Sequence, residues 1–304
     1  MEYIIETHNL EKRYKNFKAL NNLNMHIKKG SIYGLIGKNG AGKTTLIRLI
    51  CGLQKPTSGT YSIYGILNEN KKIIETRKRI GAIIETPSIY LDMTAEDNLK
   101  EQYKIIGLPS YDNLNEILKL VGLSETGKKK AKNFSLGMKQ RLGIAISLVG
   151  NPDILILDEP INGLDPEGII EIRELILKLN KEMGITVLIS SHYLDELSKI
   201  ATCYGFVDKG RIIKEISSQE LEQNCKKRVE LKVSNIKECV KYLEEYKYSY
   251  EVISGKIINV YNKINISELA IALSNRNCTI NEFHEKEESL ENYYINLIGG
   301  GEDV

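Results

Sequence analysis

Short apolar runs that alternate with longer amphipathic stretches dominate residues 1–216. The run 154–157 reads Ile-Leu-Ile-Leu, which is typical of a strand buried on both faces, as in a parallel sheet. Helical spacing of apolar residues covers most of 94–148 and the stretch 167–183. Further expected strands are Ser31–Ile36, Thr60–Gly65, Arg79–Ile84 and Thr186–Ser190. Strands that alternate with helices predict an α/β fold built on a mostly parallel sheet.

Two other segments are predicted to add antiparallel strands. Residues 3–26 mix polar and apolar positions around Asn and Lys clusters, which indicates two or three strands of a small sheet. Residues 204–216 have the pattern of a hairpin that turns at Asp208-Lys209-Gly210.

The pattern changes near residue 217, where a polar stretch to 227 begins. Beyond it, the expected strands are 228–233 and 256–261, and the expected helices are 236–246 and 266–276. We therefore expect two domains, 1–216 and 217–304, the second being a small α+β unit that folds separately. The glycines at 299–301 are expected to be frayed.

Composition narrows the possible functions. A formal net charge of +2 gives no strong field of the kind that marks nucleic-acid binders. No apolar run is long enough to cross a bilayer, and residues 1–6 do not resemble a signal peptide, so membrane work would need a separate membrane partner. The five cysteines, at 51, 203, 225, 239 and 278, have no C-x-x-C spacing. They favour free thiols in a reducing compartment over disulfides or a zinc site.

The strongest motif follows the expected strand at 31–36. Residues Gly37-Lys38-Asn39-Gly40-Ala41-Gly42-Lys43-Thr44 fit the phosphate-binding loop pattern G-x-x-x-x-G-K-[ST], and Thr45 continues it. The small residues let backbone N–H groups approach a polyphosphate, and the helix that starts here directs its positive end at the anion. Lys43 is expected to reach the β- and γ-phosphates, and the Thr44 hydroxyl to help hold Mg²⁺.

Two adjacent carboxylates end the buried strand at 153–158. An Asp at the carboxyl edge of a neighbouring parallel strand can supply the second protein ligand of a nucleotide-bound Mg²⁺, which predicts that role for Asp158. Glu159 is then placed to orient or deprotonate an attacking water.

Further segments resemble the ATP-binding cassette (ABC) ATPases in one consistent order. Phe134-Ser135-Leu136-Gly137-Met138 resembles the family's signature segment, although its usual form is Leu-Ser-Gly-Gly-Gln and only Ser135 and the second glycine, Gly137, are kept. Asn162-Gly163-Leu164-Asp165 resembles the D-loop, and Ser191-His192 the switch histidine. Tyr14 stands where the family places an aromatic ring against adenine.

The resemblance covers about residues 1–216 and implies a fold and a mechanism. The fold is a P-loop ABC-type ATPase domain with an antiparallel β subdomain and a helical signature subdomain. Two such domains close head to tail around two ATP molecules, each held by one chain's phosphate loop and by Ser135 and Gly137 of the other. Asp165 of the D-loop is also expected to help bind the nucleotide, and His192 to contact the γ-phosphate.

The variant signature and the segment Ile83-Ile84-Glu85-Thr86-Pro87 look like the bacitracin and lantibiotic exporter subgroup. In that subgroup Glu85 stands where most ABC ATPases carry the Gln of the Q-loop, and residues 289–294 also resemble the end of such subunits. The implied protein is the ATP-hydrolysing subunit of a membrane exporter, held at the cytoplasmic face of the membrane by a permease. Its role would be resistance or immunity to a membrane-active peptide antibiotic.

The sequence is also compatible with other functions. The same ATPase could serve an exporter of another drug or of a lipid, because the substrate is chosen by the membrane subunit. A soluble ABC protein acting on ribosomes or DNA usually has tandem cassettes or long heptads, neither of which this chain has. Glu85 is expected either to ligate Mg²⁺ or to turn toward the permease, because a free carboxylate would repel a triphosphate. Phe17 and the histidines at 8, 26 and 284 are interpreted as structural.

Overall fold

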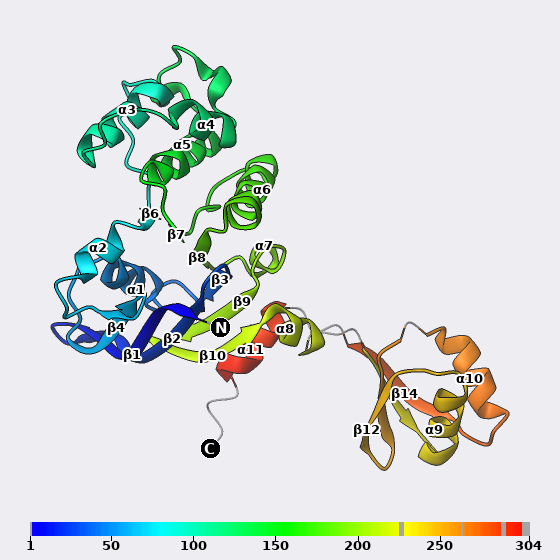
Figure 1. Cartoon of the computed structure of the whole chain (residues 1–304). Coiled ribbons are helices and arrows are strands. Elements are labelled where there is room, and N and C mark those ends of the chain that lie inside the picture. The colour runs from blue at the N-terminus through cyan, green and yellow to red at the C-terminus, as the bar shows by residue number, and fades with distance from the viewer. Residues whose placement is uncertain (1, 225–227, 263, 287–289, 300–304) are drawn as a thin grey trace. The chain divides into compact units, whose positions relative to one another are not determined.

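The computed structural model describes the whole chain except residues 1, 225–227, 263, 287–289 and 300–304. The chain divides into two compact units, Met1–Ser218 and Gln219–Val304 (Figure 1). Each unit has its own buried core. No helix in the described part of the chain combines the length and the apolar character that crossing a lipid bilayer requires.

The first unit contains a small antiparallel sheet near its start. Strands β1 (Tyr3–Tyr14) and β2 (Phe17–Lys28) form a long hairpin, and the sheet order is β2-β1-β4-β5, with β4 at Ser58–Ile63 and β5 at Ile66–Leu67. Residues 3–26 therefore form two strands, within the two or three that the sequence predicts. The hairpin turn places Tyr14 opposite Phe17.

A six-stranded sheet is the centre of the first unit, and its order is β10-β9-β3-β8-β7-β6. Its strands are β3 (Ile32–Ile36), β6 (Ile80–Ile83), β7 (Ile154–Asp158), β8 (Thr186–Ser191), β9 (Cys203–Asp208) and β10 (Arg211–Ser217). All neighbours are parallel except the β9–β10 pair. Every residue of β3, β7 and β8 is buried, as the unbroken apolar runs predict.

The helices of the first unit follow its strands. They are α1 (Lys43–Ile50), α2 (Ile73–Arg77), α3 (Ala95–Ile105), α4 (Leu114–Leu120), α5 (Leu136–Leu148), α6 (Pro166–Met183) and α7 (Leu194–Ser198). Helices α3, α4 and α5 gather into a helical group (Figure 1). The residue before each of α3, α5 and α6 accepts a hydrogen bond from a first-turn N–H, which fixes where the helix begins; these are Thr94, Ser135 and Asp165.

The second unit is a four-stranded antiparallel sheet with two helices. Strand β11 (Arg228–Val233), helix α9 (Ile236–Glu245), strands β12 (Tyr250–Ser254) and β13 (Ile257–Val260), helix α10 (Ile266–Ser274) and strand β14 (Ile280–Lys286) follow in that order. The strand order β12-β13-β11-β14 makes this the βαββαβ arrangement of ferredoxin-like domains. Helices α8 (Ser218–Asn224) and α11 (Leu290–Gly299) flank it in sequence.

The sequence predicts β11, β13, α9 and α10 correctly but misses β12, β14, α8 and α11. The compact units meet at residues 218 and 219, close to the expected change at 217. Separate roles for 1–216 and 217–304 stay a prediction. Residues 300 and 301 of the expected frayed tail, and Cys225, lie outside the described residues.

Candidate nucleotide site

The phosphate loop connects the end of β3 to the start of α1. Gly40 and Gly42 have φ of 81° and 110°, a conformation that side chains rarely adopt. An added Cβ at Gly42 would lie 2.7 Å from the Ala19 carbonyl oxygen. Only glycine at this position lets the loop pass β2 without a clash. The turn of the β9–β10 hairpin supports the loop, since Gly210 N donates to Ala41 O at 2.9 Å and Asn21 N donates to Gly210 O at 2.9 Å.

A pocket of about 250 Å³ opens at this loop. Its lining residues are Phe17, Ala19, residues 38–45 and Glu159. The predicted loop residues Lys38, Asn39, Gly40, Ala41, Gly42, Lys43, Thr44 and Thr45 all lie on it. Backbone N–H groups at the start of a helix, in a concave site, form the arrangement that binds phosphate groups.

Lys43 is the charged group at the centre of the pocket. Its side chain is 6% exposed, and Nζ donates to Gly37 O at 2.6 Å. Nζ also lies 3.2 Å from Glu159 Oε1. A buried ammonium needs such partners, because an isolated charge is strongly disfavoured away from water.

Thr44 and Asp158 meet beside Lys43. Thr44 Oγ1 donates to Asp158 Oδ2 at 2.8 Å, and Ser190 Oγ donates to Asp158 Oδ1 at 2.5 Å. Asp158 is 1% exposed at the end of β7, so its position is fixed by the sheet. In the described part of the chain no three His, Cys, Asp or Glu side chains form a metal cluster. The pair of oxygens fits Mg²⁺, which usually takes one or two protein ligands and completes its shell with water and phosphate oxygens.

Glu159 connects the phosphate loop to His192. Its carboxylate is 19% exposed, with Oε1 toward Lys43 and Oε2 2.8 Å from His192 Nδ1. The backbone of Glu159 has φ of 51°, and its N–H donates to Ser190 Oγ at 3.0 Å. An uncommon backbone conformation held by a neighbouring strand is frequent at functional sites. The structure thus brings together the three residues predicted as catalytic, Lys43, Glu159 and His192.

The signature and D-loop residues lie elsewhere in the unit. Ser135 caps α5, accepting from Met138 N at 3.2 Å, and Asp165 caps α6, accepting from Gly168 N at 3.1 Å. An added Cβ at Gly137 would lie 3.8 Å from Gly168, so the starts of the two helices are adjacent. None of Ser135, Gly137 and Asp165 lines the phosphate-loop pocket of their own chain.

The aromatic residues near the pocket are arranged differently from the expectation. Tyr14 donates its hydroxyl hydrogen to Gln54 Oε1 and is not among the pocket-lining residues, whereas Phe17 lines the pocket and is 60% exposed. The adenine role of Tyr14 and the structural interpretation of Phe17 both stay predictions. The two residues pair across the turn of the hairpin, so the sequence alone does not show which ring lines the pocket.

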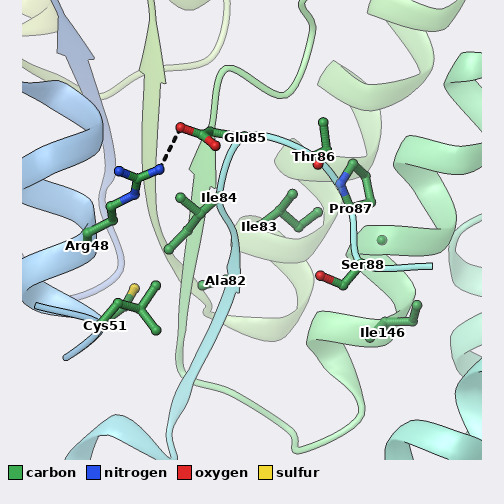
Figure 2. A pocket seen from close by; sticks show the side chains of 12 residues that line it. Arg48, Cys51, Ala82, Ile83, Ile84, Glu85, Thr86, Pro87, Ser88 and Ile146 are labelled. Carbon is green, nitrogen blue, oxygen red and sulfur yellow. Dashed lines mark hydrogen bonds and ion pairs between the residues drawn. The ribbon is translucent and has the colours of Figure 1, made fainter.

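Glu85 lies in a second pocket, of about 460 Å³, and not in the phosphate-loop pocket (Figure 2). Its Oε1 accepts a hydrogen bond from Arg48 Nη2 at 2.7 Å. The role of Glu85, as a ligand of Mg²⁺ or as a contact with the permease, stays a prediction.

Cys51 contributes the thiol that lines this second pocket. Burial raises the pKa of Cys51 to about 12, with the nearby Asp158 charge adding to the increase, so the group stays protonated at neutral pH. The four described cysteines are all free, as predicted.

Comparison with known proteins agrees with this geometry. Residues 20–162 match the ABC transporter family. The chain is 43% identical to the bacitracin transport ATP-binding protein BcrA of Bacillus licheniformis, over 99% of each chain. It is 41% identical to BcrA of Enterococcus faecalis, over 99% of this chain and 98% of the relative. The lantibiotic transport ATP-binding protein SrtF of Streptococcus pyogenes is 45% identical over 70% of this chain and 90% of its own length.

Solved structures give the same result. An ATP-binding cassette crystallised as a dimer with ADP and Pi has a TM-score of 0.63 and 28% identity, covering 70% of this chain and 98% of its own. CbiO1 of Clostridium perfringens, part of the transporter complex cbiONQ, has a TM-score of 0.66 and 28% identity, covering 81% and 96%. The predicted α/β ABC fold is confirmed. The chain belongs to the ATP-binding proteins of ABC transporters, and it is an ATPase.

Proposed function

We propose that this ATPase drives a membrane exporter that protects the cell from a bacitracin- or lantibiotic-like peptide. The proposed substrate class rests on how much of the chain is similar to the BcrA proteins. The BcrA proteins match through the second unit as well as the cassette, over 98–99% of their own lengths. A match limited to the cassette would support ATP hydrolysis alone.

The first step of the proposed mechanism is binding of the triphosphate at the start of α1. Backbone N–H groups of residues 38–44 surround the phosphates, and Lys43 exchanges Glu159 for the β- and γ-phosphates. Thr44 and Asp158 would hold Mg²⁺, which offsets the negative charge of the phosphates when bound.

The second step is attack of water on the γ-phosphorus, which breaks its bond to the β–γ bridging oxygen, so that ADP leaves and inorganic phosphate is formed. Glu159 orients the water and accepts its proton, and His192 holds Oε2 so that the carboxylate keeps its direction. Through its contact with Glu159, His192 would also respond to whether the γ-phosphate is bound. Asp158 keeps its place through Ser190 and does not take part in the proton transfer.

A second chain completes the site in this proposal. Ser135 and Gly137, at the start of α5, would contact the γ-phosphate bound by the partner's phosphate loop, with Asp165 beside them at the junction. The solved cassette bound to ADP and Pi is a dimer, which supports this arrangement.

The proposed membrane partner is a permease, which would hold the ATPase at the cytoplasmic face of the membrane. The second pocket, with Glu85 at its rim and Pro87 and Ile146 in its lining, is the proposed contact (Figure 2). Its position between the phosphate-loop helix and α5 suits a surface that transmits nucleotide state to a neighbour.

The test is a deletion of the gene in its own host, complemented by wild type or by Glu159→Gln. Increased sensitivity to bacitracin or to a lantibiotic, restored only by wild type, would support the proposal. Sensitivity to an unrelated drug or altered lipid export alone would assign the ATPase to another exporter. Co-purification with ribosomes or DNA, and with no integral membrane protein, would contradict the export function.

A further inference from the structure

Arg48 and Glu85 form an ion pair that joins two parts of the nucleotide unit. Arg48 lies in the last turn of α1, four residues after Thr44 and therefore on the same face of that helix. Glu85 follows β6, and its Oε1 lies 2.7 Å from Arg48 Nη2 (Figure 2). The Arg48 and Glu85 side chains are 35% and 61% exposed.

The sheet register places this pair at the catalytic edge. Strands β6 and β7 are parallel, with Ile83 opposite Leu157. The residues that follow them, Glu85 on one strand and Asp158 and Glu159 on the other, therefore leave the sheet at the same end. Three carboxylates at one edge would together oppose an incoming triphosphate unless cations balance them. Before ATP binds, Lys43 pairs with Glu159, and Arg48 pairs with Glu85.

The backbone around Glu85 limits where its carboxylate can turn. Glu85 has φ of 64°, and Thr86 N donates to Ile84 O at 2.9 Å in a tight turn. Pro87 is packed so closely on α5 that an added Cβ at Gly143 would lie 2.6 Å from it. With both ends of the turn fixed, the Arg48 side chain decides the direction of the carboxylate.

We propose that Arg48 is a positioning residue for Glu85, holding the carboxylate on α1 and balancing its charge so that a glutamate at this position is compatible with ATP. The proposal rests on the nucleotide site described under the proposed function. It assigns Arg48 a role only because residue 85 is acidic. With an amide at residue 85, the arginine has no charge to balance.

The alternative is that Arg48 stabilises the fold alone. Exposed ion pairs contribute little to stability, so loss of this one is not expected to unfold the protein. The two explanations differ in how the effects of two substitutions combine, which a double-mutant cycle measures.

The experiment compares Arg48→Gln, Glu85→Gln and the double variant in the full chain. Affinity for ATP with Mg²⁺ is measured by calorimetry at low and high salt. In the presence of Glu85, Arg48→Gln is expected to weaken ATP affinity by about two- to fivefold at low salt, and by less at high salt. In the Glu85→Gln background, Arg48→Gln is expected to have no further effect. An equal loss in both backgrounds, or no loss in either, would overturn the proposal.

Arg79 and Asp153 provide a matched control at the opposite end of the same strands, where they also form an ion pair. Arg79→Gln is expected to leave ATP affinity unchanged whether or not Asp153 is replaced by Asn. Thermal unfolding without nucleotide checks that each variant is folded. Wild-type protein that fails to bind ATP would contradict the nucleotide site itself, and that result is distinct from a failure of the Arg48 proposal.

Discussion

The two units of this protein have equally well-defined cores but very different sequences. In the first unit, side chains of fixed identity recur at fixed spacings, from the phosphate loop to His192. The second contains no phosphate-type motif, and its strands and helices are recognised mainly by the spacing of apolar residues, although Leu231, Val233 and Leu243 are fully buried. The first unit has recognisable motifs because phosphate and metal contacts require particular side-chain and backbone atoms at particular positions. A packed sheet and helix pair demand only shape and apolar surface.

Removal of the catalytic base from the first unit is expected to have the largest effect. Glu159→Gln keeps the shape of the side chain but cannot accept a proton, so ATP hydrolysis is expected to fall by about 10²–10⁴-fold. ATP binding should persist, and the variant should accumulate as an ATP-bound dimer on size-exclusion chromatography. Glu182→Gln, on an exposed position of α6, is the control. Normal turnover by Glu159→Gln would remove this residue from catalysis.

Lys43→Ala is expected to weaken the binding of ATP. The substitution removes the buried ammonium from the phosphate pocket, and unit charges about 4 Å apart attract by roughly 4 kcal/mol at an effective dielectric of about 20. Part of that is offset by solvation, so we expect ATP affinity to fall by more than about tenfold in calorimetry. Lys181→Ala, at an exposed position near the end of α6, should bind ATP as wild type does. Equal affinities for the two variants would contradict the role of Lys43.

Removal of the second unit tests the prediction that this unit is not needed for nucleotide binding. A chain of residues 1–218 is expected to bind ATP with an affinity within about threefold of the full chain, because the described pocket residues all precede 218. In the cell, the same truncation is expected to lose resistance to the peptide antibiotic. A soluble truncated chain without ATP affinity would contradict the first expectation, and full resistance at normal abundance would contradict the second.

Substitution of Glu85 is expected to give the smallest biochemical effect. Glu85→Gln should leave ATP binding largely intact but reduce resistance, and Glu85→Ala should reduce it more, because it also removes both oxygens. Resistance, ATP affinity and subunit abundance are measured together, so that loss of coupling is separated from misfolding. Full resistance of both variants at normal abundance would leave Glu85 as a tolerated replacement of glutamine.

Much of the site could be predicted from the sequence because each of its parts is a short contiguous motif, and the order of the parallel strands implies that the motifs meet. The loop from Gly37 to Thr44 is contiguous, and a buried apolar strand implies that the Asp158-Glu159 pair stands at its end. The pairing of Arg48 with Glu85 was not predicted, since Arg48 belongs to none of these motifs and only tertiary packing brings the two side chains together. The place of Phe17 on the pocket could not be predicted, because alternation in a strand does not say which aromatic ring faces the loop.

The second unit was less predictable for a related reason. Strand β14 reads Ile-Asn-Glu-Phe-His-Glu-Lys, which is too polar to suggest a strand, yet it forms the edge of a sheet and pairs with β11 along most of its length. Strand β12 is the other edge and is mostly exposed. Edge strands have one unpaired side and are less buried. Apolar residues therefore mark them less clearly in the sequence than they mark β11 or β13.

The support that the hairpin turn at Gly210 gives to the phosphate loop also sets the order in which function appears during synthesis. The loop follows β3, whose neighbours β8 and β9 lie at 186–191 and 203–208. A ribosome that has made the phosphate loop must therefore add well over a hundred residues before the strands beside it exist. We therefore expect the sheet around the phosphate loop, and with it the affinity for nucleotide, to form only near the end of the first unit's translation.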